Sequence, residues 1–208
     1  MTDVSPRRSP LQVWLMLGIV VAVIVGGFVA LPRDEQSKQR LLALLGTSNR
    51  GVLLRPMVPV ATLDLRTPEG GAPLDWSKLA PKWRLLIPVT SPCADACRAA
   101  LYLTRQVHVR LEKDAARVER VLLVLGAPLD EATRTWLQRE HPHLTLVQGN
   151  PADFARWPAA VASGWTSAES RVFVVDRAGM AMLYFTPSHS GADMLADLHH
   201  LLKYSPEN

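Results

Sequence analysis

The apolar run at residues 11–31, LQVWLMLGIVVAVIVGGFVAL, places the strongest constraint on what this chain can fold into. It contains no charged residue, and about 20 such residues in a helix cross the hydrocarbon core of a bilayer. A cleavable signal peptide has a shorter apolar region of roughly 7–15 residues. We therefore expect an uncleaved transmembrane anchor at 11–31, with cleavage after FVA at 28–30 as the alternative.

The charges beside this run predict its orientation. Arg7 and Arg8 precede it, whereas the single Arg33 that follows is at once offset by Asp34 and Glu35. Because Lys and Arg favour the cytoplasmic side of a membrane, residues 1–10 are predicted to be cytoplasmic. The chain has no second run of this kind, so we expect a single-pass protein of a bacterial inner membrane with a periplasmic C-terminal domain.

The remaining sequence fits one small globular domain. The chain has 208 residues, 48% of them hydrophobic, and a net charge of +4. Its basic residues are scattered and do not alternate with aromatic residues, so nucleic acid is not an expected partner. We expect a juxtamembrane stalk at 32–56, with a short helix at 36–45, and a folded domain at 57–205.

Within that domain, short apolar runs alternate with segments of helical periodicity, which predicts an α/β fold with a largely parallel central sheet. Helix starts are predicted at the N-caps Asp130 and Ser190. The predicted strands are 60–65, 83–89, 117–126, 144–149 and a hairpin within 171–185, and the predicted helices are 95–114, 128–141, 151–164 and 190–205.

Cys93 and Cys97 are the only cysteines of the chain and lie where a predicted strand leads into a helix. Residues four apart share one helix face. Two thiolates there can bind a soft ion such as Cu(I) or Zn, act as a redox dithiol, or form a structural disulfide. The helix N-terminus favours the thiolate form, whereas the carboxylate of Asp95 between them opposes it. The residues leave these alternatives open.

This order of elements, with a cysteine pair between an early buried strand and its helix, resembles the thioredoxin fold, a central mixed sheet flanked by helices. The Cys-x-x-x-Cys spacing behind one N-terminal anchor is similar to the Sco family of copper chaperones, which help to build the copper centre of cytochrome c oxidase. The segments that carry the resemblance are ATLDLRTPEG (61–70), WRLLIPVTSPCADAC (83–97) and VFVVDRAG (172–179).

The resemblance implies that Cys93 and Cys97 form a copper-binding or thiol-redox pair in respiratory oxidase biogenesis. It implies Cu(I) as the metal, and the inner membrane with an oxidase subunit or another assembly factor as partners. The chain departs from the family at Ala94 and Arg98, where the family has proline. The family's third copper ligand is a histidine, and the matching neighbourhood, 167–170, has none, although Glu169 lies there.

The sequence therefore predicts a divergent Sco-like assembly factor rather than an enzyme. One alternative is a periplasmic thiol-disulfide oxidoreductase, although Ser170 stands where thioredoxin-type enzymes have a proline. The other is a non-catalytic interaction module with a structural disulfide. None of the six histidines is placed by its spacing to complete a ligand set with the cysteines: His108, His141, His143, His189, His199 and His200.

Overall fold

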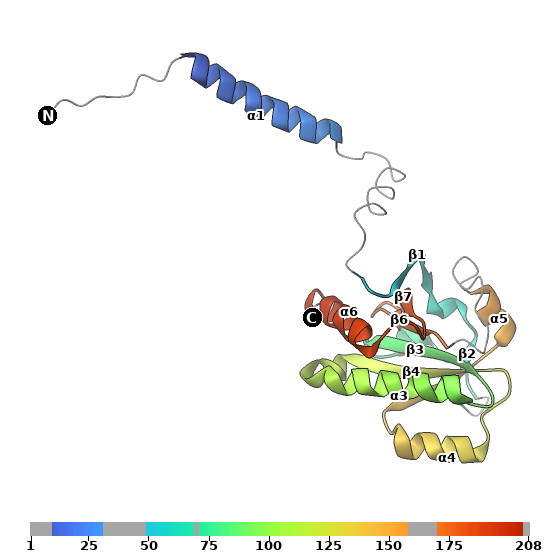
Figure 1. The fold of residues 1–208 in the computed structure, drawn as a ribbon. Coiled ribbons are helices and arrows are strands. Elements are labelled where there is room, and N and C mark those ends of the chain that lie inside the picture. Colours follow the sequence, from blue (N-terminus) through green and yellow to red (C-terminus); the bar gives the residue numbers. More distant parts are fainter. Residues whose placement is uncertain (1–9, 31–48, 69–70, 158–169, 206–208) are drawn as a thin grey trace. The chain divides into compact units, whose positions relative to one another are not determined.

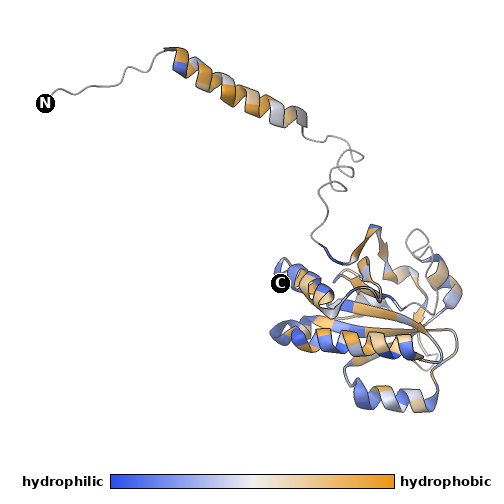
Figure 2. Ribbon diagram, in the orientation of Figure 1, coloured by the Kyte–Doolittle hydropathy of each residue, from blue (hydrophilic) through white to orange (hydrophobic). Residues whose placement is uncertain are grey.

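The computed structural model describes residues 10–30, 49–68, 71–157 and 170–205, and the chain forms two separate units, 1–48 and 49–208. The first contains helix α1 (Pro10–Ala30), which is long and apolar enough to cross a membrane at Leu11–Phe28. Most residues of this helix are hydrophobic (Figure 2), and none of the stretch Leu11–Phe28 is buried. This helix confirms the predicted apolar span.

The second unit is built on one seven-stranded mixed sheet with strand order β1-β7-β6-β3-β4-β5-β2 (Figure 1). The central strands β3, β4 and β5 are parallel, whereas the other neighbouring pairs are antiparallel. The strands are β1 (Val52–Pro59), β2 (Leu65–Arg66), β3 (Trp83–Thr90), β4 (Val118–Leu125), β5 (Leu144–Gly149), β6 (Val172–Val175) and β7 (Met180–Phe185).

Helices cover both faces of this sheet. The α-helices of the unit are α3 (Asp95–Arg110), α4 (Glu131–Glu140), α5 (Pro151–Arg156) and α6 (Gly191–Lys203), and the short 3-10 helices are η1 (Val60–Thr62), η2 (Trp76–Lys78) and η3 (Glu112–Arg117). The predicted fold class, a thioredoxin-like mixed sheet flanked by helices, is confirmed.

Local sequence accounts for several of these boundaries. Asp130 caps α4 by accepting a hydrogen bond from the backbone N–H of Thr133. Ser190 and Asp193 form a reciprocal capping box at the start of α6. In the hairpin between β6 and β7, Gly179 adopts a positive φ of 85°, which favours glycine, and Asp176 accepts a hydrogen bond from the N–H of Met180 at 2.8 Å.

The core has two parts, one on each face of the sheet. On one face α3, α4 and α6 pack aliphatic side chains and both cysteines against β3 and β4. We call this the disulfide face. On the other, α5, η1 and η2 surround an aromatic group. We call it the aromatic face. The aromatic group consists of Trp76, Phe154, Trp157, Phe173 and, partly buried, Tyr184.

The structure differs from the predictions at the start of the unit. Strand β1 begins at Val52, within the segment expected to be a stalk, and pairs with β7. The strand predicted at 60–65 is wrong, because η1 occupies 60–62 and only Leu65–Arg66 pairs with β5. The hydroxyl of Thr62 donates to the carbonyl of Pro59 at 2.8 Å, which stabilises a turn there.

All four helices of the unit are shorter than predicted, and α4 and α6 differ by one to three residues at their ends. Helix α3 ends at Arg110, and η3 follows it. Helix α5 ends at Arg156, and the rest of the predicted helix, from residue 158, lies outside the described residues. So do residues 32–48 of the predicted stalk, with its expected helix at 36–45.

Candidate dithiol site

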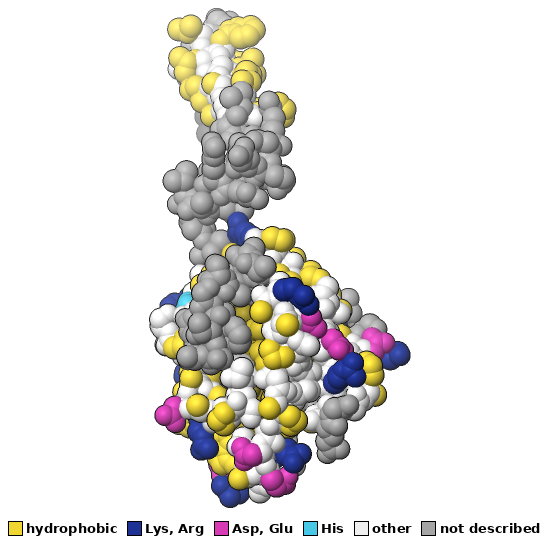
Figure 3. All heavy atoms as spheres, turned by 90° about the vertical axis from the view of Figure 1, so that its right-hand side faces the viewer, with side chains coloured by type: hydrophobic (Ala, Val, Ile, Leu, Met, Phe, Trp, Pro, Cys, Tyr) yellow, Lys and Arg dark blue, Asp and Glu magenta, His cyan; other side chains and the backbone are white. Residues whose placement is uncertain are grey.

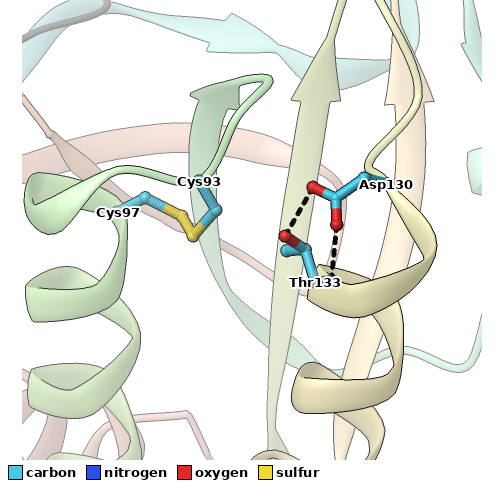
Figure 4. Close-up of a disulfide and its surroundings, with 4 residues drawn as sticks. All are labelled: Cys93, Cys97, Asp130 and Thr133. Atoms are coloured by element: carbon cyan, nitrogen blue, oxygen red, sulfur yellow. Dashed lines mark hydrogen bonds between the residues drawn. A yellow bond between two sulfur atoms is a disulfide. The ribbon is translucent and has the colours of Figure 1, made fainter.

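Cys93 and Cys97 form a disulfide between the turn after β3 and the first turn of α3 (Figure 4). Their Cα atoms lie 5.3 Å apart. Both residues belong to the core of the disulfide face, with exposed fractions of 5% and 6%. The structure thus brings the two predicted site residues together, and it contains no free cysteine.

The turn that carries Cys93 is anchored to the loop before α4. The hydroxyl of Ser91 donates a hydrogen bond to the carbonyl of Pro128 at 3.2 Å. The N-cap of α3 is Ala94, whose side chain cannot accept a hydrogen bond from the helix. The partial positive charge of this helix end would favour a thiolate after reduction, whereas the carboxylate of Asp95 in the first turn of α3 opposes it.

The first turn of α4, with Asp130 and Thr133, lies on the side of the disulfide away from α3 (Figure 4). Asp130 accepts hydrogen bonds from the hydroxyl and the backbone N–H of Thr133, at 2.7 and 2.8 Å. These two bonds lower the pKa of the Asp130 carboxyl, so it remains an ionised helix cap near the site. Its capping role was predicted from the sequence, whereas its place opposite Cys93 and Cys97 was not.

A second group that the sequence did not indicate lies between α3 and α4. The guanidinium of Arg98, directly after Cys97, stacks over the ring of Trp136 at 4.7 Å. The other neighbour of Trp136 is His141, whose ring centroid lies 5.2 Å away. The sequence indicated Arg98 only as a departure from the family pattern. Its contact with Trp136 could not be predicted, because the two residues are far apart in the sequence.

Two basic residues are buried on the same face. Arg120 of β4 donates to the carbonyl of Leu101 at 2.8 Å and to the hydroxyl of Thr104 at 3.2 Å. Burial and then the charge of Arg105 lower the pKa of Arg120 to about 10. Burial, followed by the charges of Arg120 and Arg105, lowers the pKa of His141 to about 4.

The histidines do not complete a metal site in the part of the chain that the structure describes. It contains no group of three or more His, Cys, Asp or Glu side chains that could hold a metal ion. The ring of His108 bonds the carbonyls of Ala115 and Val118 near the far end of α3, and Nδ1 of His189 accepts from the N–H of Thr186. Residues 167–169, including Glu169, lie outside the described residues.

Comparison with protein families gives a match over residues 83–205, from the first residue of β3 to just beyond α6. The family is described as the transmembrane-like, thioredoxin-like, C-terminal domain. The chain belongs to this family. Comparison with curated protein sequences gives no match.

The solved structures with a similar fold include Sco proteins and thiol-disulfide proteins. Yeast Sco1 with copper bound matches with a TM-score of 0.53 and 12% identity, over 77% of this chain and 97% of that chain. Arabidopsis thaliana ScoI with copper bound matches with a TM-score of 0.52 and 12% identity, over 74% of this chain and 99% of that chain. A Chlorobium tepidum thiol:disulfide interchange protein matches with a TM-score of 0.51 and 14% identity, over 74% of this chain and 98% of that chain. At these identities the likeness establishes the fold.

Proposed function

We propose that this protein is a membrane-anchored, thioredoxin-like accessory factor for the biogenesis of a respiratory cytochrome c oxidase, acting through Cys93 and Cys97. The observation that carries the proposal is the disulfide at the junction of β3 and α3, on a sheet shared with the copper-bound Sco structures. The apolar helix α1 supports the membrane anchor. We place the N-terminus in the cytoplasm and the C-terminal unit in the periplasm of a bacterium.

Thiol-disulfide exchange with a partner dithiol is the first chemistry of the pair. A partner thiolate attacks one sulfur of the Cys93–Cys97 bond, that bond breaks, and the other cysteine leaves as a thiolate. A second partner thiol then displaces the first cysteine from the mixed disulfide. The partner ends as a disulfide, and Cys93 and Cys97 have gained two electrons and, once protonated, two protons.

Copper transfer is the second candidate, with Cu(I) as the cargo. One thiolate in the turn after β3 and one in the first turn of α3 can together bind a soft ion, and the copper-bound Sco structures share the fold. The proposal assigns the sulfurs of Cys93 and Cys97 as the ligands, and the described residues contain no group of three or more His, Cys, Asp or Glu side chains that could hold a metal ion. The role is that of an assembly factor rather than an enzyme.

The full-length protein in phosphatidylcholine nanodiscs tests both chemistries. We expect its reduction potential, measured against glutathione, to lie above about −300 mV, the level below which structural disulfides usually fall. After reduction, we expect one equivalent of Cu(I) in a competition titration, and none for the double variant Cys93→Ser/Cys97→Ser. A potential below that level together with unchanged Cu(I) binding in the double variant would leave only a structural disulfide.

The cellular role needs its own test. In a bacterium that carries this gene, its deletion should lower cytochrome c oxidase activity, and the wild-type gene should restore it. The gene for Cys93→Ser/Cys97→Ser should not restore activity, although the variant protein accumulates in the membrane. Full restoration by this variant would instead support an interaction module whose cysteines are structural.

A further inference from the structure

The side of α3 that faces solvent carries one stripe of four residues, which begins directly after Cys97. Arg98, Tyr102, Arg105 and Val109 follow one another at helical spacing, so they lie within an arc of about 60°. The stripe is about 16 Å long, the rise of eleven helical residues. Tyr102 and Val109 are large side chains with 64% and 65% of their surface exposed.

Both charged residues of this stripe are arginines. The single acidic residue of α3 is Asp95 in the first turn, three residues before Arg98 and outside the stripe. Arg105 makes no ion pair among the residues that the structure describes, and its charge lowers the pKa of both Arg120 and His141 beneath it. Glu140 is the acidic group nearby on α4, and it already pairs with Arg139 at 2.9 Å.

Eight basic residues elsewhere on the unit have acidic partners. On the face drawn in Figure 3, Lys and Arg side chains are interspersed with Asp and Glu. These ion pairs have N–O distances of 2.5–3.1 Å: Arg50–Asp193, Arg66–Asp64, Lys78–Asp75, Arg84–Glu119, Arg117–Asp114, Arg134–Glu131, Arg139–Glu140 and Arg156–Asp153. Arg98 and Arg105 have no such ion pair among the described residues, and Arg98 contacts the ring of Trp136 instead.

We propose that the stripe on α3 docks an acidic, amphipathic segment of a protein partner and presents that partner's thiols to Cys93 and Cys97. This inference rests on the proposed function, whose partner it describes. Tyrosine and arginine are the residue types that contribute most to binding at protein interfaces. Charge complementarity with an acidic segment supplies the orientation and the association rate.

A protein segment fits this surface better than a lipid bilayer does. The two exposed apolar side chains alternate with arginines along a narrow line, which matches alternating apolar and acidic residues of one chain. The stripe also starts at the residue after Cys97, so its occupant lies beside the disulfide. A protein can offer a dithiol at that point, whereas a bilayer would cover the disulfide without reacting with it.

The test uses the full-length protein in phosphatidylcholine nanodiscs and two short fluorescent peptides without cysteine, one of alternating Glu and Leu and one of alternating Lys and Leu. Fluorescence anisotropy should show the Glu peptide binding at least about tenfold more tightly, and the difference should shrink with added salt. Arg98→Gln/Arg105→Gln should remove about tenfold in affinity for the Glu peptide. The matched double variant Arg66→Gln/Lys78→Gln loses the same charge from β2 and η2 and should bind as the wild type does.

Three results would overturn the docking proposal. The first is equal binding of the two peptides, or an unchanged affinity in Arg98→Gln/Arg105→Gln. The second is arginine-dependent binding to phosphatidylglycerol vesicles without binding of the Glu peptide, which would assign the stripe to a membrane surface. The third is self-association through these arginines, seen by light scattering, with no peptide binding.

The same experiment separates docking from chemistry. Because the peptides contain no cysteine, their binding does not depend on thiol exchange. Tight, arginine-dependent binding with a disulfide that glutathione cannot reduce would retain the docking surface and reject the redox function. A reactive disulfide with no peptide preference would do the reverse.

Discussion

Two buried arginines on opposite faces of the sheet differ in whether a carboxylate pairs with them. Arg84, on the aromatic face, is 2% exposed and pairs with Glu119 at 2.8 Å. Arg120, on the disulfide face, is 3% exposed and bonds only a carbonyl and a hydroxyl of α3, with no carboxylate partner among the described residues. One charge is neutralised where it is buried, whereas the other leaves positive potential beneath the helix that carries Cys97.

The side chains around the two arginines show the same division. On the aromatic face, the ring of Phe173 lies 5.5 to 6.2 Å from those of Trp157, Tyr184 and Phe154. The core of the disulfide face is mainly aliphatic, but it also contains the disulfide and the buried rings of Trp83 and Phe185. Both faces therefore contribute packing that holds the sheet. The rings cluster most densely around Phe173 on the aromatic face, whereas the disulfide face also carries the cysteine pair and the buried charge of Arg120.

The largest expected effect is on the aromatic face. Phe173→Ala should lower the free energy of unfolding by about 3–5 kcal/mol, because it opens a cavity between three rings. Urea unfolding of the full-length protein in detergent micelles, followed by tryptophan fluorescence, measures it. Phe173→Leu should cost about 1 kcal/mol. A loss for Phe173→Ala smaller than that for removing the disulfide would contradict the division between the faces.

The next effect is a pH dependence on the disulfide face. The pKa of His141 is about 4 in the fold and 6.5 as the ordinary value, so the unfolded chain binds the proton more tightly. Stability should therefore fall as pH falls from about 6.5 to about 4, by up to about 3 kcal/mol from this residue. His141→Leu should flatten the urea-midpoint profile over that range.

The exposed neighbour His143 provides the matched control for that profile. It lies two residues beyond His141 in the same loop, and His143→Leu should leave the pH profile as in the wild type. A profile that His143→Leu flattens and His141→Leu does not would show that burial on the disulfide face is not the cause.

Removal of the disulfide should have a moderate effect. Cys93 and Cys97 close a loop with a sequence separation of only four, for which the loop entropy lost amounts to about 2 kcal/mol. We therefore expect Cys93→Ser/Cys97→Ser to lower the free energy of unfolding by about that amount and to keep the fold. The circular dichroism spectrum should be unchanged, and a fully unfolded variant would show that the bond is needed for the fold itself.

The smallest expected effect is at the cap of α6. Ser190→Ala removes the acceptor for the N–H of Asp193, which lies 3.2 Å from the hydroxyl, and should cost about 1 kcal/mol. Ser190→Asn keeps a side-chain acceptor and should cost less. Urea unfolding distinguishes the two variants, and equal losses would mean that the cap does not set the stability of this helix.

Local patterns in the sequence predicted the elements that depend on neighbouring residues. The apolar span, the central strands β3, β4 and β5, the β6–β7 hairpin and the N-caps Asp130 and Ser190 are confirmed. In each case the pattern lies within a few residues of the sequence. In β3, for example, a short apolar run predicted a strand buried on both faces, and the structure shows that burial. The spacing of Cys93 and Cys97 likewise allowed a disulfide, although it did not exclude a metal site or an open dithiol.

Strand β1 illustrates what such patterns miss. Its sequence, VLLRPMVP, contains two prolines and no clear alternation, and it becomes a strand by pairing with β7 at the other end of the domain. The buried carboxylate of Asp197 on α6 also holds this end of the chain, because it accepts hydrogen bonds from the N–H groups of Arg50 and Gly51 at 3.0 and 2.9 Å.

The sequence by itself determined the apolar span, the alternation of strands and helices, and the position of the cysteine pair at a helix start. Only the tertiary structure decided that β1 completes the sheet, that Arg120 and His141 are buried together, and that the start of α4 faces the disulfide. The physical reason is that periodicity and capping act over a few residues. Pairing, burial and charge at this site depend instead on which distant segments the sheet brings side by side.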